Sequence, residues 1–411
     1  MTIVEPKPEP ACANRAVLDD QQLAEIQRGA PGPSPSGDGV VVGLIEEVGI
    51  DYTHGELGGT GNLDFDRQAV ARGTHPAIAP FFDAAGSWVD PIRHPLSAPP
   101  THGDATARCI AGRAPSGAPP LGVAPRARIR YATTTPAADR SHLAQALRDL
   151  TDVQRNPVRV IAVPHAGALA RKDAVERAVA AGIVVVEAHG ANERVAIGNP
   201  PPGCSLVVSA YDVATHTNVA SYGPGLTLLA CGQLGTDSQS MATALVAGTV
   251  ALLLEAHPDW QPFDVMRAVT QTAFKPPAMG RAVFSDELGW GLLRASAALR
   301  LTTADLLPLP PVEIGWDPLG GAREMPLSWR NRPTANEVGM VVGLFRDPDH
   351  TGFARPPEVE LRFGGDHRAT RVRFPTPGRW RIVLQAEDRF GRRSEIVPSV
   401  IVPPGAEPFH I

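Results

Sequence analysis

The chain has 411 residues, of which 43% are hydrophobic and 20% charged, as in a soluble globular protein larger than one typical domain. Its formal net charge of -5, without a cluster of Lys and Arg, argues against nucleic acid as the main partner. The cysteines form no Cys-x-x-Cys pair, so no zinc site is expected; they are Cys12, Cys109, Cys204 and Cys231.

The N-terminal residues do not show the pattern of a signal peptide, a basic segment followed by an apolar one. The apolar run at 245–254 is too short to cross a bilayer. We therefore expect a cytoplasmic protein with reduced thiols, without a cofactor, a bound metal or contact with a membrane.

The first elements in chain order are a helix at 17–27 and a Pro-rich linker, which together make an N-terminal segment of residues 1–38. Residues 40–45 follow as a short apolar run, which predicts a buried strand. Glu46 and Glu47 come directly after it, where open α/β sheets place their ligand crevice. They are functional candidates, or else solvated loop residues.

A helix is predicted at 101–112, with His102 at its entrance. A histidine there can project into a cleft, although a lone histidine is more often a surface or core residue. Strands then alternate with helices, which predicts a parallel sheet with helices on both faces. The strands are expected at 127–132, 158–163, 183–187, 206–210 and 226–230, and the helices at 141–152, 172–181, 262–273 and 292–299.

Ser240 begins a long apolar run, 240–256, that contains no Pro and reads as a helix buried in a large core. The positive end of the helix dipole would favour negative charge developing at this serine, which suits a nucleophile. The alternative is that Ser240 serves as an N-cap or a small packing residue.

The pattern changes after residue 303. A Pro-rich linker at 306–312 leads to apolar segments that alternate with polar residues between Gly, Pro and Asp turns. They predict a small antiparallel β-sandwich with a structural or partner-binding role. The predicted domains are residues 1–38, 39–303 and 304–411.

An acid, a histidine and a serine thus occur in that order, each at the end of a buried element. Acyl transfer needs a hydroxyl nucleophile, an imidazole that takes its proton, and an acid that orients the imidazole. The three residue types together favour this chemistry more than each does alone.

The motifs around these residues resemble those of the subtilisin-like serine peptidases. The resemblance covers residues 38–300 and includes His102-Gly-Asp-Ala-Thr-Ala, Gly122-Val-Ala-Pro, Gly-Ala-Asn192-Glu and Ser240-Met-Ala. It implies a subtilisin-like α/β fold, a parallel sheet flanked by helices, for this part of the chain. The smaller C-terminal all-β sandwich domain is predicted from the strand pattern alone. It implies catalytic roles for Glu47, His102 and Ser240, with Glu46 as the competing acid.

The resemblance also assigns Asn192 to the oxyanion site and Pro164, His165 and Gly167 to the substrate-binding strand. His189 also ends a strand and is a further candidate for substrate binding, or else a buried polar residue. Four features depart from the family pattern. The acid position falls on Glu47 with one extra residue, and Asn192 is displaced by one residue. Ser238-Gln239 replaces Gly-Thr, and Pro164 cannot donate a backbone hydrogen bond.

Two functions follow. The first is a cytoplasmic peptidase that cleaves a specific peptide or protein, for instance a peptide of a biosynthetic pathway. The second is a protein of this fold with lost or repurposed peptidase activity, which acts as a binding scaffold or catalyses a non-proteolytic reaction. In both, the C-terminal domain is free to contact other proteins.

Overall fold

The computed structural model describes residues 35–47, 49–92, 101–113, 122–133, 140–165, 172–190, 194–197, 203–212, 215–232, 238–280, 282–316, 324–334, 336–346, 356–376, 380–396 and 400–402. The chain divides into two compact units, Met1–Leu301 and Thr302–Ile411. This division lies two residues before the predicted boundary at 303/304. Most of the predicted N-terminal segment, including the helix expected at 17–27, lies outside the described residues.

Unit 1 is built on a sheet with the strand order β10-β8-β7-β6-β1-β5-β2. Neighbours along this order are parallel, and β9 pairs with β8 in the antiparallel direction. The predicted parallel sheet is therefore confirmed. Its strands are β1 (Val41–Glu46), β2 (Ile78–Ala79), β5 (Arg128–Thr133), β6 (Val160–Val163), β7 (Val184–Ala188), β8 (Leu206–Asp212), β9 (Thr217–Asn218) and β10 (Leu228–Cys231).

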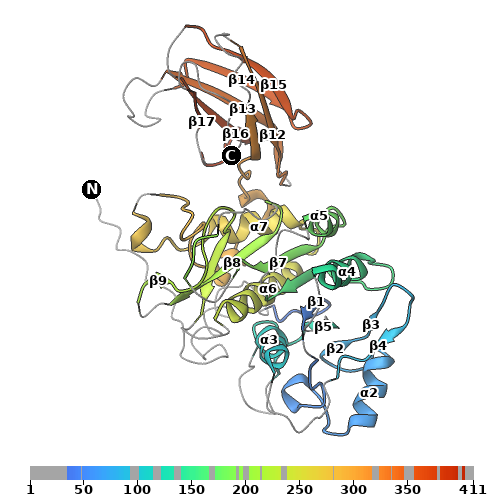
Figure 1. Cartoon of the computed structure of the whole chain (residues 1–411). Coiled ribbons are helices and arrows are strands. Elements are labelled where there is room, and N and C mark those ends of the chain that lie inside the picture. Colours follow the sequence, from blue (N-terminus) through green and yellow to red (C-terminus); the bar gives the residue numbers. More distant parts are fainter. Residues whose placement is uncertain are drawn as a thin grey trace. The chain divides into compact units, whose positions relative to one another are not determined.

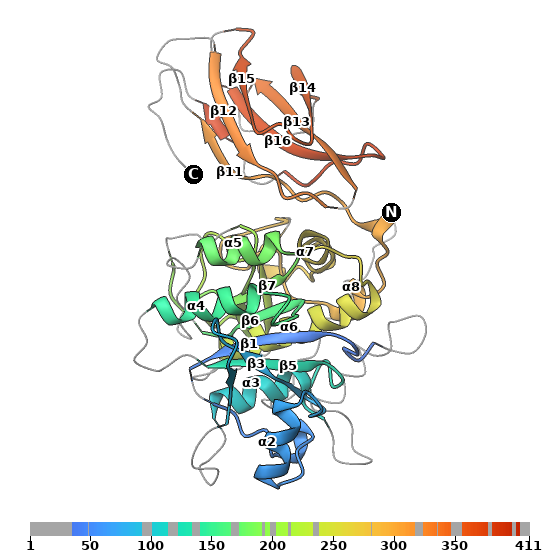
Figure 2. The ribbon, with the colours of Figure 1, turned by 90° about the vertical axis from the view of Figure 1, so that its right-hand side faces the viewer.

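Helices lie on both faces of this sheet, as Figures 1 and 2 show. One face packs against α4 (Arg140–Thr151) and α5 (Lys172–Ala180), and Ile45 and Ile161 join the core there. Side chains alternate between the faces of a strand, so even-numbered residues of β1 face the opposite side. There lie α3 (His102–Ala111) and α6 (Ser238–Ala256), which pack against each other.

Short elements complete unit 1. They are η1 (Gly55–Leu57), α2 (Leu63–Ala71), β3 (Phe81–Phe82), β4 (Trp88–Val89), α7 (Pro262–Gln271), η3 (Pro277–Met279) and α8 (Ala295–Ala298). The helix α2 was not predicted, because that region was read as loops with short strands.

Helix α6 is the central helix of unit 1. It contacts β1, β6, β7, β8 and β10 and is 19 residues long. By length and composition alone it could cross a membrane, so the expectation that no apolar segment is long enough is wrong. Within the fold, 78% of its most apolar window is buried, as in the core helix of a globular unit.

The Gly122-Val-Ala segment closes the C-terminal end of α3. The backbone N–H groups of Gly122, Val123 and Ala124 donate to the carbonyls of Gly112, Cys109 and Ile110 at 2.9, 3.0 and 2.8 Å. These bonds satisfy carbonyls that a helix end leaves without partners. A Cβ at residue 122 would lie 2.3 Å from the backbone N of Gly112, which explains why the first position is glycine.

The cysteines do not all remain free thiols. Cys109 and Cys204 are free and buried. Cys231 is disulfide-bonded, so the expectation of reduced thiols throughout the chain is wrong at this position.

Unit 2 is the predicted antiparallel β-sandwich, with sheets ordered β11-β12-β15 and β14-β13-β16-β17. A shared core between the sheets includes Trp316, Met325, Trp329, Trp380 and Leu384. The elements are η4 (Thr303–Asp305), β11 (Val312–Trp316), β12 (Glu324–Arg330), β13 (Glu337–Arg346), β14 (Val359–Gly364), β15 (Ala369–Arg373), β16 (Trp380–Asp388) and β17 (Val400–Val402).

The first half of the predicted Pro-rich linker packs as part of unit 2. Leu306 and Leu309 are 0% and 1% exposed, and the side chain of Arg332 donates to the carbonyl of Pro310. Asn336 and Arg392 donate to the carbonyl of Leu306. The exposed connection therefore comes earlier, at 302–305.

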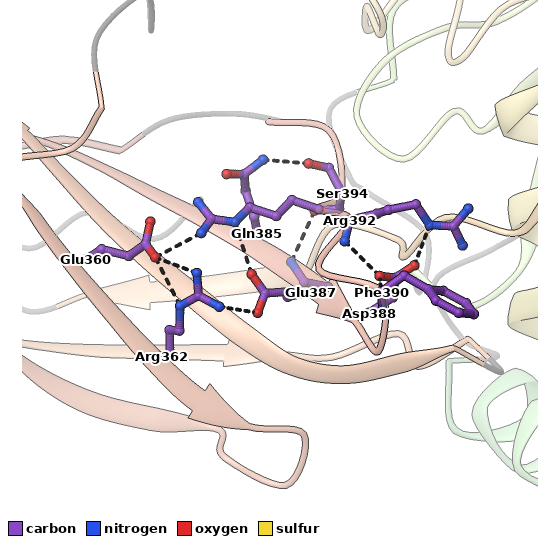
Figure 3. Close-up of polar contacts among 10 residues, drawn as sticks. Glu360, Arg362, Gln385, Glu387, Asp388, Phe390, Arg392 and Ser394 are labelled. Atoms are coloured by element: carbon purple, nitrogen blue, oxygen red, sulfur yellow. Dashed lines mark hydrogen bonds and ion pairs between the residues drawn. The ribbon is translucent and has the colours of Figure 1, made fainter.

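A set of charged side chains covers the outer face of the β14-β13-β16 part of this sandwich (Figure 3). Arg362 donates to Glu360 and, across the intervening strand β13, to Glu387 at 3.0 and 2.6 Å. Arg393 contacts the same two carboxylates. Gly339 of β13 pairs with Glu387, and a Cβ at this glycine would lie 2.5 Å from the backbone oxygen of Phe363.

Candidate active site

The candidate site begins with Glu46 at the C-terminal end of β1. Its Oε2 lies 3.0 Å from Nδ1 of His102, the first residue of α3. The Glu46 side chain is 2% exposed and that of His102 is 28% exposed. Glu47 follows the end of the strand and is exposed. The assignment of Glu47 as the partner of His102 is therefore wrong, because the strand turns Glu46, not Glu47, towards α3.

A capping box fixes the start of α3 and with it the backbone of His102. The Thr101 hydroxyl accepts from the backbone N of Asp104 at 3.1 Å, while Asp104 accepts from the backbone N of Thr101 at 2.7 Å. Asp104 also accepts from the backbone N of Asp51 at 2.8 Å, which ties the segment after β1 to the helix. Asp51 and His54 themselves cap local turns: Asp51 accepts from the backbone N of Thr53, and His54 from the backbone N of Glu56.

The other oxygen of the Glu46 carboxylate has a partner that the sequence did not reveal. The Thr106 hydroxyl donates to Oε1 of Glu46 at 2.7 Å, and Thr106 is fully buried. Tyr131 of the adjacent strand β5 also lies in this environment. Burial, with the negative charges of Glu46 and Asp104, raises the pKa of Tyr131 well above its ordinary value, so the phenol stays protonated.

Ser240 is the third residue of α6, within the first turn of a 19-residue helix. Its hydroxyl donates to the carbonyl of Pro164 at 2.6 Å, and the residue is only 5% exposed. The packing of α3 on α6 brings the helix of His102 against the helix of Ser240, and the Cys109 thiol of α3 lies 3.9 Å from the carbonyl of Met241. Ser240 is thus a buried residue in this structure.

Gln239 links the first turn of α6 to the sheet. Its amide N donates to the Ser221 hydroxyl at 3.1 Å and to the carbonyl of Val208 at 3.3 Å. Its amide oxygen accepts from the backbone N of Gly190 at 3.3 Å. Gln239 therefore joins three segments beside the candidate nucleophile, which the sequence showed only as a departure from the expected Thr.

The predicted substrate-binding and oxyanion residues are only partly described. Asn192 and Gly167 lie outside the described residues. Pro164 follows β6 and accepts from Ser240, and His165 after it is partly buried. His189 is 5% exposed, with Nδ1 3.3 Å from the Ser221 hydroxyl. Burial lowers its pKa, so it stays neutral, which fits the alternative of a buried polar residue.

The described residues therefore place a carboxylate against an imidazole, and a hydroxyl in the first turn of the helix that packs against α3. These are the three groups that nucleophilic attack by a serine requires. Among the described residues, no group of three or more His, Cys, Asp and Glu side chains could hold a metal ion.

Known proteins share this sequence pattern. A sequence model of the subtilase family matches residues 37–291. Alkaline elastase YaB of Bacillus sp. (strain YaB) is 28% identical over 197 residues, which cover 44% of this chain and 50% of the elastase. The chain spans half or less of the length of the curated relatives that it matches.

Solved structures share the fold. Fervidolysin from Fervidobacterium pennivorans, a keratinolytic enzyme related to subtilisin, aligns with a TM-score of 0.52 and 19% identity over 96% of this chain and 60% of fervidolysin. A serine protease of Aeromonas sobria, in complex with its chaperone, aligns with a TM-score of 0.52 and 17% identity over 90% of this chain and 86% of that chain. At these identities the likeness shows the fold alone.

Proposed function

The chain belongs to the subtilase family, and from this premise we propose that it is a serine peptidase whose nucleophile is Ser240, with His102 as general base and Glu46 as the orienting acid. The observation that carries the proposal is the 3.0 Å contact between Glu46 Oε2 and His102 Nδ1 at the start of α3. A carboxylate at Nδ1 selects the tautomer whose Nε2 can accept a proton.

In the proposed reaction, the Ser240 hydroxyl breaks its hydrogen bond to the Pro164 carbonyl and donates to Nε2 of His102 instead. The serine oxygen then attacks the substrate carbonyl while its proton moves to Nε2. The imidazolium that forms is stabilised by the Glu46 carboxylate, which stays ionised. The positive end of α6 favours the negative charge on the tetrahedral intermediate. Asn192 remains the predicted oxyanion donor. The proposed substrate is a specific peptide or protein, such as one of a biosynthetic pathway.

A fluorophosphonate probe tests the nucleophile without a known substrate. We expect covalent labelling of the wild-type chain, and loss of labelling in Ser240→Ala because the attacking oxygen is gone. Ser238→Ala, two residues earlier in the same helix turn, is the matched control and should still be labelled. Mass spectrometry of the labelled peptide identifies the modified serine.

A second function is favoured by one observation. The Ser240 hydroxyl donates to Pro164 and the residue is 5% exposed, an arrangement that suits a structural serine in a binding scaffold. A wild-type chain that resists the probe under all pH conditions, while remaining folded, would support this scaffold and contradict the peptidase proposal.

A further inference from the structure

The Glu46 carboxylate is held at both oxygens by side chains of the same helix. Oε2 lies 3.0 Å from His102 Nδ1, and Oε1 accepts from the Thr106 hydroxyl at 2.7 Å. His102 and Thr106 are four residues apart, so they lie on one face of α3, which turns towards the end of β1.

The Thr106 hydroxyl has three acceptors in reach but only one proton to donate. The carbonyl oxygens of His102 and Gly103 both lie 3.1 Å away, further than Glu46 Oε1 at 2.7 Å. A charged acceptor at a shorter distance makes the stronger hydrogen bond. The proton therefore goes to Glu46.

Water cannot easily replace this hydroxyl. Thr106 is 0% exposed and Glu46 is 1% exposed. A glutamate also has one more rotatable bond than an aspartate, so a single contact leaves more freedom of rotation in its carboxylate. A second donor at Oε1 restricts that rotation and keeps Oε2 directed at the imidazole.

We propose that Thr106 is a positioning residue for the acid–histidine pair, an inference that rests on the proposed peptidase function. It holds the Glu46 carboxylate in the orientation that the imidazole needs and stabilises its ionised form. It acts through Glu46 and touches no substrate.

The sign of the expected pH effect follows from the groups around the carboxylate. Glu46 contacts His102 of α3, and its charge, together with that of Asp104 of α3, acts on Tyr131 of β5, which stays neutral. Cys109, also on α3, has its pKa raised to about 12 by burial and stays a thiol. Removing the Thr106 donor leaves the negative charge of Glu46 less stabilised, so the acid–histidine pair binds a proton more tightly.

The test compares Thr106→Val, which removes the hydroxyl at nearly constant shape, with Thr106→Ser, which keeps it. Thr249→Val is the matched control, because Thr249 is buried in α6 and donates to the carbonyl of Leu245. Fluorophosphonate labelling rates are measured from pH 5 to 9 on the full chain. His102 is titrated in parallel by NMR of histidine-labelled protein, with His102→Gln to assign its signal.

We expect Thr106→Val to slow labelling at neutral pH by about 10- to 100-fold. The acid limb of the labelling rate and the midpoint of the His102 titration should both move to higher pH. In Thr106→Ser, the acid limb and the His102 midpoint should lie near their wild-type positions, because the hydroxyl is kept. Thr249→Val should leave both at their wild-type positions.

An acid limb and a His102 titration that stay in place or move to lower pH in folded Thr106→Val would overturn the inference. So would a shift in Thr106→Ser as large as that in Thr106→Val. If the valine variant does not fold, Thr106→Ala gives the same comparison without a bulky side chain. The NMR titration needs no catalysis, so it decides the role of Thr106 even if the wild-type chain is not labelled.

Discussion

The two units of this chain use carboxylates in different ways. In unit 1, the side chain of Glu46 is 2% exposed and contacts an imidazole and a hydroxyl. In unit 2, the side chains of Glu360 and Glu387 are 29% and 15% exposed and pair with arginines (Figure 3). The charge of a buried carboxylate is stabilised by each of its protein partners, because water cannot take the place of a lost partner. An exposed carboxylate can bind water when it loses a partner, so each partner contributes less.

This difference explains why the connected ion pairs of unit 2 carry less functional information than the single buried pair of unit 1. Hydrogen bonds from Arg393 and Arg362 lower the pKa of Glu360 and keep it ionised. Arg393 pairs with both Glu360 and Glu387. Each exposed ion pair contributes little to the free energy of unfolding, so a stabilising effect would come from the connected set as a whole.

The largest effect should follow from breaking the buried pair. Glu46→Gln keeps the shape of the side chain but removes the charge that stabilises the imidazolium, so we expect fluorophosphonate labelling to slow by about 10³- to 10⁴-fold. Labelling kinetics at pH 7 to 8 measure this. Glu47→Gln is the matched control: because Glu47 is exposed, this variant should keep most of the wild-type labelling rate. Equal losses in both variants would contradict the assignment of Glu46.

An intermediate effect is expected from Glu337, at the start of β13. Burial raises its pKa to about 7, against the opposing influence of Arg368 and Arg332, and its Oε2 has no hydrogen-bond partner among the described residues. Folded unit 2 therefore binds more protons than unfolded unit 2 between about pH 4.5 and 7, and its stability falls as pH rises through that window, by at most about 3 kcal/mol.

Glu337→Gln should remove this pH dependence, because the amide is neutral in both states. Urea unfolding of the full chain at pH 5 and pH 8, followed by tryptophan fluorescence, measures the free energy of unfolding. An equally steep loss of stability with pH in the variant would show that Glu337 is not its source.

The smallest effect is expected from the exposed network. Arg362→Ala removes the side chain that bridges Glu360 and Glu387, and should lower the free energy of unfolding by about 0.2–1 kcal/mol, less at high salt. Urea unfolding at 50 mM and 500 mM salt measures this. A loss above about 2 kcal/mol would mean that the network behaves like a buried pair and would remove the contrast between the units.

The sequence predicted most of unit 1 because its strands and helices have strong apolar patterns. It could not choose between Glu46 and Glu47, since residues 41–45 are apolar or glycine on both faces and show no alternation. Packing decides the choice: Ile45 lies in the core under α4 and α5, so the next residue faces α3. Thr106 could have been found from its helical spacing to His102.

In unit 2 the sequence indicated strands at 338–345, 358–363, 379–386 and 396–402, and it missed β11, β12 and β15. In β12, Met325, Leu327 and Trp329 alternate with more exposed residues. Pro326 hid the pattern, because proline usually argues against a strand interior. The sequence also predicted a Pro-rich linker at 306–312. Leu306 and Leu309 are instead buried, and the carbonyls of Leu306 and Pro310 accept hydrogen bonds from Asn336, Arg392 and Arg332, which are distant in the sequence.

The Cys109 thiol offers a direct view of how firmly α3 and α6 stay together. It lies between the helix of His102 and the helix of Ser240, and burial keeps it protonated, so alkylating reagents react with it only when the two helices separate. The rate of its modification thus reports the opening of the core beneath the candidate site, independently of any catalytic assay.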